Sequence, residues 1–183
     1  HMLDCAPLLD CARLQGKALI DVGTGAGFPG MVLKVLCPTL ELTLLDGLQK
    51  RLDWLDTVAE ELALANVRTI HGRAEEAGLD PALREQFDFA TARAVADLRV
   101  LCELCLPFVK VGGRFLAMKS IECGAELDSS AHAIETLGGE LVGCHDYTIP
   151  HTDVTHRVVV IEKRASTPAR YPRRWAKIQK APL

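Results

Sequence analysis

The stretch that decides the fold is Ala18–Gly30, which reads ALIDVGTGAGFPG. Its first five residues, Ala18–Val22, form a short apolar run with the length and character of a buried strand. Glycines follow at positions 23, 25 and 27, and Met31–Leu36 then has the composition of a helix. Because glycine tolerates positive φ and has no Cβ, the backbone of such a turn can lie against a ligand. The unpaired N–H groups at the helix start favour a polar or anionic group, so the stretch predicts a site for a nucleotide-like ligand.

An acidic residue stands at the end of the next apolar run. Glu41–Leu45 reads ELTLL, the pattern of a second buried strand, and Asp46 follows it directly. A carboxylate there can accept hydrogen bonds from both hydroxyls of a ribose. Dinucleotide-binding enzymes have G-x-G-x-x-G before such an acid, whereas G-x-G-x-G, as here, is typical of S-adenosylmethionine-dependent methyltransferases. The alternative is a turn that only joins strand to helix, and it leaves the position of Asp46 unexplained.

Length and composition indicate one globular domain. The chain has 183 residues, of which 49% are hydrophobic and 25% charged, and these values are ordinary for a soluble protein. No apolar run approaches the roughly 20 residues that span a bilayer, and no signal peptide is apparent. Seven cysteines, an odd number, fit reduced thiols in the cytoplasm. We therefore expect a cytoplasmic protein with no membrane partner. Since no helix has a second uninterrupted apolar face, we also expect a monomer.

Cys102 and Cys105 form an isolated C-x-x-C pair. A zinc site needs a second pair of ligands, and none lies close by in the sequence. With Leu98 and Leu101, the two cysteines occupy one face at helical spacing. We expect them in the core and predict no metal site.

The charge of the chain is unevenly distributed. The net charge is −3, but residues 164–183 contain six basic residues and no acid, so they carry +6 and leave −9 for residues 1–163. Tyr171 and Trp175 stand among the basic residues and offer stacking faces beside phosphate-binding charge. We predict a catalytic domain over residues 1–163 and a basic C-terminal tail over residues 164–183 that contacts RNA. A solvated, flexible tail is the alternative.

Strand-like and helix-like segments alternate along most of the chain. Helices are expected at Leu3–Leu14, Met31–Leu36, Leu48–Leu62, Leu98–Val109 and Glu126–Leu137. Strands are expected at Ala18–Val22, Glu41–Leu45, Val67–His71, Phe87–Thr91, Arg114–Lys119, Glu140–Ile149 and Arg157–Glu162. The last two strands have no helix between them, which predicts an antiparallel pair at the C-terminal edge. The pattern predicts an α/β protein with a doubly wound, seven-stranded, Rossmann-like sheet.

In a doubly wound sheet the ligand lies beyond the carboxyl ends of the strands. Those ends carry Gly23–Phe28, Asp46, Gly72–Glu76, Arg93 and Lys119. Phe28 packs either against the ligand or against a helix, and Glu75 either meets an adenine amino group or is a surface acid. Arg93 follows an apolar strand, where an unpaired guanidinium is costly. It therefore needs a carboxylate, a phosphate or the ligand as its partner.

Two acceptor chemistries lack their motifs. No Asn/Asp-Pro-Pro-Tyr segment, which serves amino-group methylation, follows Phe87–Thr91. The nearest cysteine that could act in carbon-5 methylation, Cys102, lies about two helical turns further on. This favours an acceptor atom that is already nucleophilic. N7 of guanine is one such atom, because it has an in-plane lone pair and no proton at neutral pH. Methyl transfer to such an atom requires proximity and in-line alignment, so we nominate no catalytic acid or base.

These residues resemble those of the ribosomal RNA small-subunit methyltransferase G family, also called glucose-inhibited division protein B. The resemblance extends over nearly the whole chain, and several of its segments are specific to this family. In order, the matching segments are His1–Asp4, Asp21–Gly30, Asp46 with Lys50 and Arg51, Gly72–Glu76, Thr91–Val95 and Arg170–Arg174.

The resemblance implies transfer of a methyl group from S-adenosyl-L-methionine (AdoMet) to N7 of a guanine in 16S ribosomal RNA, near the decoding region. The implied AdoMet contacts are Gly23, Gly25, Phe28, Ala74, Glu75 and Arg93, with Asp46 on the ribose. Lys119, Arg157 and Arg173 match family positions and are assigned to RNA phosphates, with a strand-edge ion pair as the alternative for Arg157. The implied partner is 16S rRNA or the small ribosomal subunit.

The chain departs from the family pattern at several positions. Ser120 stands where glycine is usual, Asp97 where proline is common, and Trp175-Ala176 where Pro-Gly is frequent, which affects the RNA side. Family members carry helices before the His-x-Leu-Asp segment, so we expect an N-terminal part to be missing or disordered. Two other functions stay open: a ribosome-associated AdoMet-binding protein without turnover, and an AdoMet methyltransferase of a non-RNA substrate. A nicotinamide dehydrogenase is a more distant third.

Overall fold

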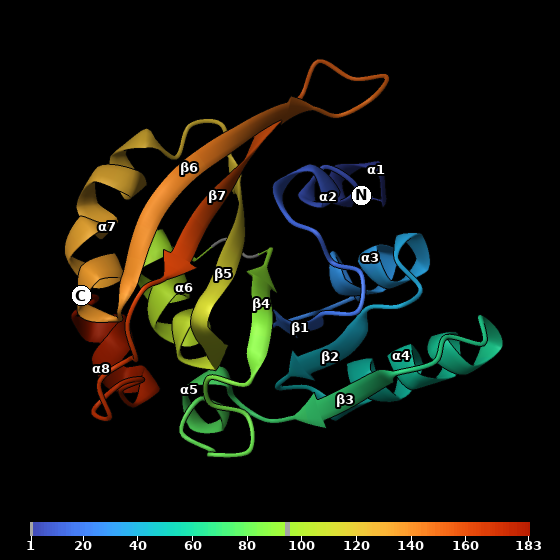
Figure 1. The fold of residues 1–183 in the computed structure, drawn as a ribbon, viewed down its shortest axis with the longest axis horizontal. Coiled ribbons are helices and arrows are strands. Elements are labelled where there is room, and N and C mark those ends of the chain that lie inside the picture. Colours follow the sequence, from blue (N-terminus) through green and yellow to red (C-terminus); the bar gives the residue numbers. More distant parts are fainter. Residues whose placement is uncertain (1, 94–95) are drawn as a thin grey trace.

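The computed structural model describes residues 2–93 and 96–183. Its centre is a seven-stranded mixed sheet with the order β3-β2-β1-β4-β5-β7-β6 (Figure 1). The strands are β1 (Ala18–Val22), β2 (Glu41–Asp46), β3 (Val67–His71), β4 (Phe87–Ala92), β5 (Val109–Ser120), β6 (Gly139–Thr148) and β7 (Thr155–Lys163). The first five pair in parallel, and β7 runs antiparallel to both β5 and β6. The doubly wound sheet with an antiparallel C-terminal edge is therefore confirmed.

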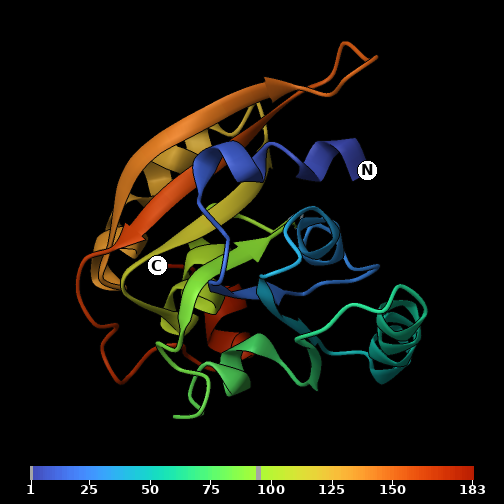
Figure 2. The ribbon, with the colours of Figure 1, turned by 45° about the vertical axis from the view of Figure 1, so that its right-hand side comes forward.

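Helices cover both faces of the sheet (Figures 1 and 2). They are α1 (Met2–Cys5), α2 (Leu8–Cys11), α3 (Gly30–Leu36), α4 (Gln49–Glu61), α5 (Ala74–Ala77), α6 (Leu98–Cys105), α7 (Gly124–Thr136) and α8 (Trp175–Lys180), with a 3-10 turn η1 (Leu106–Phe108). Within the described residues, none of these helices is long and apolar enough to cross a bilayer.

Strand side chains alternate between two core layers. In β5, Phe115 and Ala117 pack with α6 and α7, whereas Leu116 and Met118 pack with α2, α3 and α4. This follows from the period of two along a strand, which sends successive side chains to opposite faces. Cys102, like Cys105, is fully buried in the first layer, as its helical spacing predicted.

Three predicted elements differ from the structure by more than two residues at one end or more. The single N-terminal helix is instead two short helices, because Pro7 has no N–H to continue the first one. The helix from Leu98 ends at Cys105, and β5 already begins at Val109. Gly112 and Gly113 do not separate helix from strand. They lie inside β5 where its register with β4 shifts, and a Cβ on Gly113 would lie 2.5 Å from the carbonyl oxygen of Asp88.

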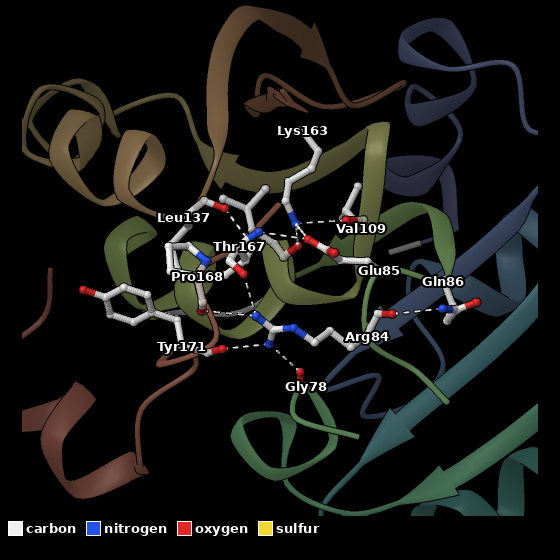
Figure 3. A network of polar contacts seen from close by, with 11 residues as sticks. Gly78, Arg84, Glu85, Gln86, Val109, Leu137, Lys163, Thr167, Pro168 and Tyr171 are labelled. Carbon is white, nitrogen blue, oxygen red and sulfur yellow. Dashed lines mark hydrogen bonds and ion pairs between the residues drawn. The ribbon is translucent and has the colours of Figure 1, made fainter. Parts of the chain in front are cut away.

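The C-terminal segment, residues 164–183, packs against the body of the protein. Figure 3 shows the guanidinium of Arg84 among backbone carbonyl groups, and it donates to Thr167, Pro168 and Tyr171 of this segment at 2.7–3.2 Å. The carboxylate of Glu85 accepts from Thr167 N at 2.9 Å. Tyr171 is 6% exposed and belongs to the main core cluster. The segment is thus ordered against the core; its contact with RNA stays a prediction.

Candidate active site

The glycine-rich turn after β1 is fixed to the end of β2. Gly23 N and Thr24 N both donate to the carbonyl oxygen of Leu45, at 2.8 and 3.1 Å. Gly23, Gly25 and Gly27 all have positive φ, which explains why glycine is needed at alternate positions. A Cβ on Gly23 would meet nothing within 4 Å. The turn therefore borders open space at the carboxyl ends of the strands, as the sequence predicted.

Asp46 holds the turn and the start of α4 together. One carboxylate oxygen accepts from Gly25 N and the other from Leu48 N, each at 2.9 Å. Arg51 lies 3.5 Å away as an ion-pair partner. Asp46 is 5% exposed, and each of its oxygens keeps acceptor capacity for a further donor. Its position at the strand end beside the glycine turn fits the predicted ribose contact.

Asp21 is a site residue that the sequence analysis did not nominate. It is fully buried in β1, and its Oδ2 accepts from Thr24 Oγ1 at 2.7 Å and from Gly30 N at 3.0 Å. Its Oδ1 is buried and has no hydrogen-bond partner among the described residues. Burial raises the pKa of Asp21 to about 6. The available signal was an acid inside an otherwise apolar strand, the D of ALIDV.

Arg93 and Phe28 come together beside the turn. Arg93 follows β4, and its guanidinium carbon lies 5.1 Å from the centroid of the Phe28 ring, within cation–π range. Its Nη1 lies 3.6 Å from Oδ2 of Asp4 in α1, which sequence analysis did not assign to the site. Of the partners predicted for Arg93, which were a carboxylate, a phosphate or the ligand, the structure shows a carboxylate, that of Asp4. Residues 94 and 95 of the TARAV segment, and His1 of the His-x-Leu-Asp segment, lie outside the described residues.

Ala74 and Glu75 lie in α5, the single turn that follows β3. Glu75 is 7% exposed and accepts a 2.6 Å hydrogen bond from Arg73 Nε. The guanidinium of Arg73 in turn lies 5.7 Å from the centroid of the Trp175 ring in α8. Glu75 is therefore a buried, paired carboxylate and not a solvated surface acid. The pair also connects this end of the site to the C-terminal segment.

Of the three basic residues assigned to RNA, Lys119 and Arg157 are register partners on β5 and β7, whereas Arg173 lies in the C-terminal segment. Each of them is paired with an acid. Lys119, at the end of β5, donates to Ala96 O and lies 2.7 Å from Glu126 of α7. Arg157 of β7 makes a two-point contact with Asp146 of β6, the alternative considered for it. Arg173 makes a two-point contact with the fully buried Glu103 of α6. Their roles toward RNA stay predictions.

A cleft of about 860 Å³ opens next to the glycine turn. Its lining combines that turn, the segment after β2, the exposed ring of Trp54 on α4 and the end of β3; the lining residues are Gly25, Ala26, Gly47, Leu48, Gln49, Lys50, Arg51, Trp54 and His71. No group of three or more His, Cys, Asp or Glu side chains in the described residues could hold a metal ion. The cleft is a concave site at the strand ends with two basic side chains and an aromatic ring in its lining. Asp46, Phe28 and Arg93 are not among its lining residues.

The fold is shared with several solved structures. The solved structure of YcgJ from Bacillus subtilis matches with a TM-score of 0.65 and 15% identity, over 91% of this chain and all of that one. TrmN from Thermus thermophilus matches with a TM-score of 0.64 and 22% identity, over 88% of this chain and 48% of that one. TYW2 from M. jannaschii, solved in complex with AdoMet, matches with a TM-score of 0.64 and 14% identity, over 82% and 70%. At these identities the likeness concerns the fold.

Sequence comparison identifies the family. Residues 1–153 match the GidB family, described as rRNA small subunit methyltransferase G. A ribosomal RNA small subunit methyltransferase G of Alkaliphilus metalliredigens is 49% identical over 100% of this chain and 77% of its own length. One from Acetivibrio thermocellus is 46% identical over 100% and 75%. The chain belongs to the rRNA small subunit methyltransferase G family, which confirms an AdoMet-dependent methyltransferase of small-subunit ribosomal RNA.

Proposed function

We propose that this chain transfers the methyl group of AdoMet to N7 of a guanine in 16S rRNA near the decoding region. The observation that supports AdoMet as the cofactor is the hydrogen bond from Gly25 N to the carboxylate of Asp46. It brings an acid with spare acceptor capacity against an open glycine turn. Membership of the family supports 16S rRNA as the substrate.

The residues at the strand ends fit AdoMet. Asp46 accepts from the ribose hydroxyls, and Gly23 and Gly25 let the backbone approach the cofactor. Ala74 and Glu75 contact the adenine base, and the Glu75 carboxylate can accept a hydrogen bond from the adenine amino group. Phe28 and Arg93 serve the methionine part, with the guanidinium facing its carboxylate.

The protein's contribution to the reaction is alignment. AdoMet, when bound, supplies a methyl group on a positively charged sulfur. N7 of guanine carries its lone pair in the plane of the base and needs no deprotonation, so the residues have to hold the base in line with the methyl group and exclude water. No catalytic acid or base is proposed for this reason.

The basic residues form the RNA side of the proposal. Lys119, Arg157 and Arg173 each have a carboxylate partner in the free protein, so an RNA phosphate would share or replace that partner. The exposed basic residues Arg174, Lys177 and Lys180 of the segment 164–183 add a salt-sensitive attraction to 16S rRNA or the small subunit. We propose that this segment is the RNA-contacting part and residues 1–163 the catalytic part.

We also propose that the protein acts as a monomer in the cytoplasm, where its ribosomal substrate is found. The surface most relevant to the oligomeric state is an apolar groove among α1, α3 and α4, because a second copy of the chain would pack there in a dimer. Met2, Leu3, Val35 and Trp54 in this groove are all more than half exposed. The sequence predicts that no single helix has a second uninterrupted apolar face, and this groove is instead lined jointly by residues of several helices. Light scattering with in-line size exclusion measures the mass, and a dimer would contradict the proposal.

The test of function uses labelled AdoMet and small-subunit particles that lack the modification, followed by chain cleavage specific for N7-methylguanine. We expect one cleavage, in the decoding-region loop. Label on 16S rRNA without N7-specific cleavage would overturn the choice of acceptor atom. AdoMet binding without label on either particles or naked 16S rRNA would instead favour a binding protein without turnover.

A further inference from the structure

The carboxylate of Asp4 is held by the two antiparallel strands at the edge of the sheet. Asp4 lies in α1 and is 3% exposed. Tyr147 of β6 donates its hydroxyl to Oδ1 at 2.8 Å and to the backbone oxygen of Asp4 at 3.0 Å. His156 of β7, the register partner of Tyr147, approaches Oδ1 with Nδ1 at 2.7 Å. Because an ionised carboxylate only accepts, Nδ1 of His156 carries the hydrogen.

The other oxygen of this carboxylate faces the candidate cofactor site. Oδ2 of Asp4 lies 3.6 Å from Nη1 of Arg93, and the same guanidinium lies over the ring of Phe28. Arg93 is 27% exposed, so it is close enough to the surface to meet a ligand. The guanidinium thus lies between a fixed carboxylate and an aromatic ring, both supplied by elements other than its own strand.

We propose that Asp4 is a positioning residue, which holds the guanidinium of Arg93 over Phe28 in the orientation that receives the cofactor. This inference rests on the role given to Arg93 in the proposed function. An arginine side chain has many rotamers. If one of them is fixed before the ligand arrives, binding costs less conformational entropy. Asp4 can do this because its own carboxylate is fixed by Tyr147 and His156.

The sign of the effect distinguishes positioning from simple charge. Asp4 partly neutralises Arg93, so if charge alone mattered, removal of Asp4 would strengthen the attraction of Arg93 for a carboxylate ligand. If Asp4 positions Arg93, its removal takes away one of the contacts that orient the guanidinium and weakens binding of the ligand. The two accounts predict opposite changes in affinity for AdoMet.

The experiment is calorimetric titration of the full chain with AdoMet. For Asp4→Asn, which keeps the side-chain shape but loses the charge, we expect the Kd to rise about tenfold. Tyr147→Phe removes one donor to Asp4 without touching Arg93, and we expect a smaller rise, about threefold. An unchanged or lower Kd in Asp4→Asn would overturn the proposal.

A double-mutant cycle with Arg93→Gln shows whether Asp4 acts through Arg93. In the Arg93→Gln background we expect Asp4→Asn to cause no further rise in Kd. Full additivity of the two losses would mean that Asp4 acts by another route and would overturn the inference. If Arg93→Gln alone leaves the Kd unchanged, the role given to Arg93 in the proposed function is wrong, and the inference falls with it.

A matched control separates positioning from general loss of stability. Glu85 is also a carboxylate that accepts from a distant segment, at Thr167 N, and it lies in the network of Figure 3 away from the site. We expect Glu85→Gln to lower the unfolding temperature with the Kd for AdoMet unchanged. If it raised the Kd as much as Asp4→Asn does, the effect of Asp4 would be explained by stability and the proposal would be wrong.

Discussion

Ionisation of Asp21, beside the glycine turn, is expected to destabilise the folded protein. It is fully buried, and desolvation raises its pKa from 3.8 to about 6 despite the hydrogen bonds from Thr24 and Gly30. Because the folded state binds this proton more tightly than the unfolded state does, ionisation of Asp21 lowers the free energy of unfolding. The cost is absent below about pH 4, grows toward pH 6 and reaches roughly 3 kcal/mol at neutral pH.

We therefore expect Asp21→Asn to change the pH dependence of stability. In urea titrations, the free energy of unfolding of the variant minus that of the unmodified protein should rise in the variant's favour from pH 4 to pH 7. The physical reason is that asparagine has the same shape and volume as aspartate but does not ionise, so the variant avoids the cost of a buried charge at neutral pH. A difference that stays constant over this range would show that Asp21 does not titrate as its burial implies.

At the scale of elements, the strands were predictable and their long-range partners were not. Apolar runs located all seven strands, and their ends located the glycine turn, Asp46 and Arg93, because a parallel sheet brings its carboxyl ends together. Asp4 could not be assigned, since its partners Tyr147 and His156 lie 143 and 152 positions away. The acids that pair with Lys119, Arg157 and Arg173 were likewise hidden, because tertiary packing decides which charges meet.

The contact between β1 and the start of α3 provides a prediction at this scale. A Cβ on Gly30 would lie 2.8 Å from Oδ2 of Asp21 and 2.9 Å from a methyl carbon of Leu44. Gly30→Ala should therefore push the helix from the strand and lower the free energy of unfolding by about 1–3 kcal/mol. Thermal or urea unfolding measures it.

The control for that substitution is Gly124→Ala in the first turn of α7, where a Cβ meets nothing within 4 Å. We expect this variant to be as stable as the unmodified protein or slightly more so, because alanine reduces the freedom of the unfolded chain. Equal losses at the two positions would mean that the close approach at Gly30 is not the cause.

At the scale of the whole molecule, the C-terminal segment is both a structural strap and the most basic part of the surface. Deleting it would remove Tyr171 from the core and leave Arg84 without three of its acceptors. Loss of RNA binding after such a deletion would therefore carry little information. Basic side chains exposed to solvent are the better target, and Arg174, Lys177 and Lys180 are of this kind.

We expect replacement of these three residues by glutamine to weaken binding to small-subunit particles. The slope of log K against log salt concentration should become shallower by about 2, because binding with fewer phosphate contacts releases fewer counterions from the RNA. Filter binding over a range of salt concentrations measures both quantities, with the Kd for AdoMet as the control. An unchanged slope would place the RNA contact elsewhere.

The position of β7 has a consequence for the order in which the molecule folds. β7 lies between β5 and β6, so residues 139–148 have no strand to pair with until residues 155–163 have been synthesised. The same last strand carries His156, which holds Asp4 near the beginning of the chain. On a growing chain, the glycine turn leaves the ribosome early. The surroundings of Arg93 are nevertheless completed only when the final strand emerges and closes the sheet.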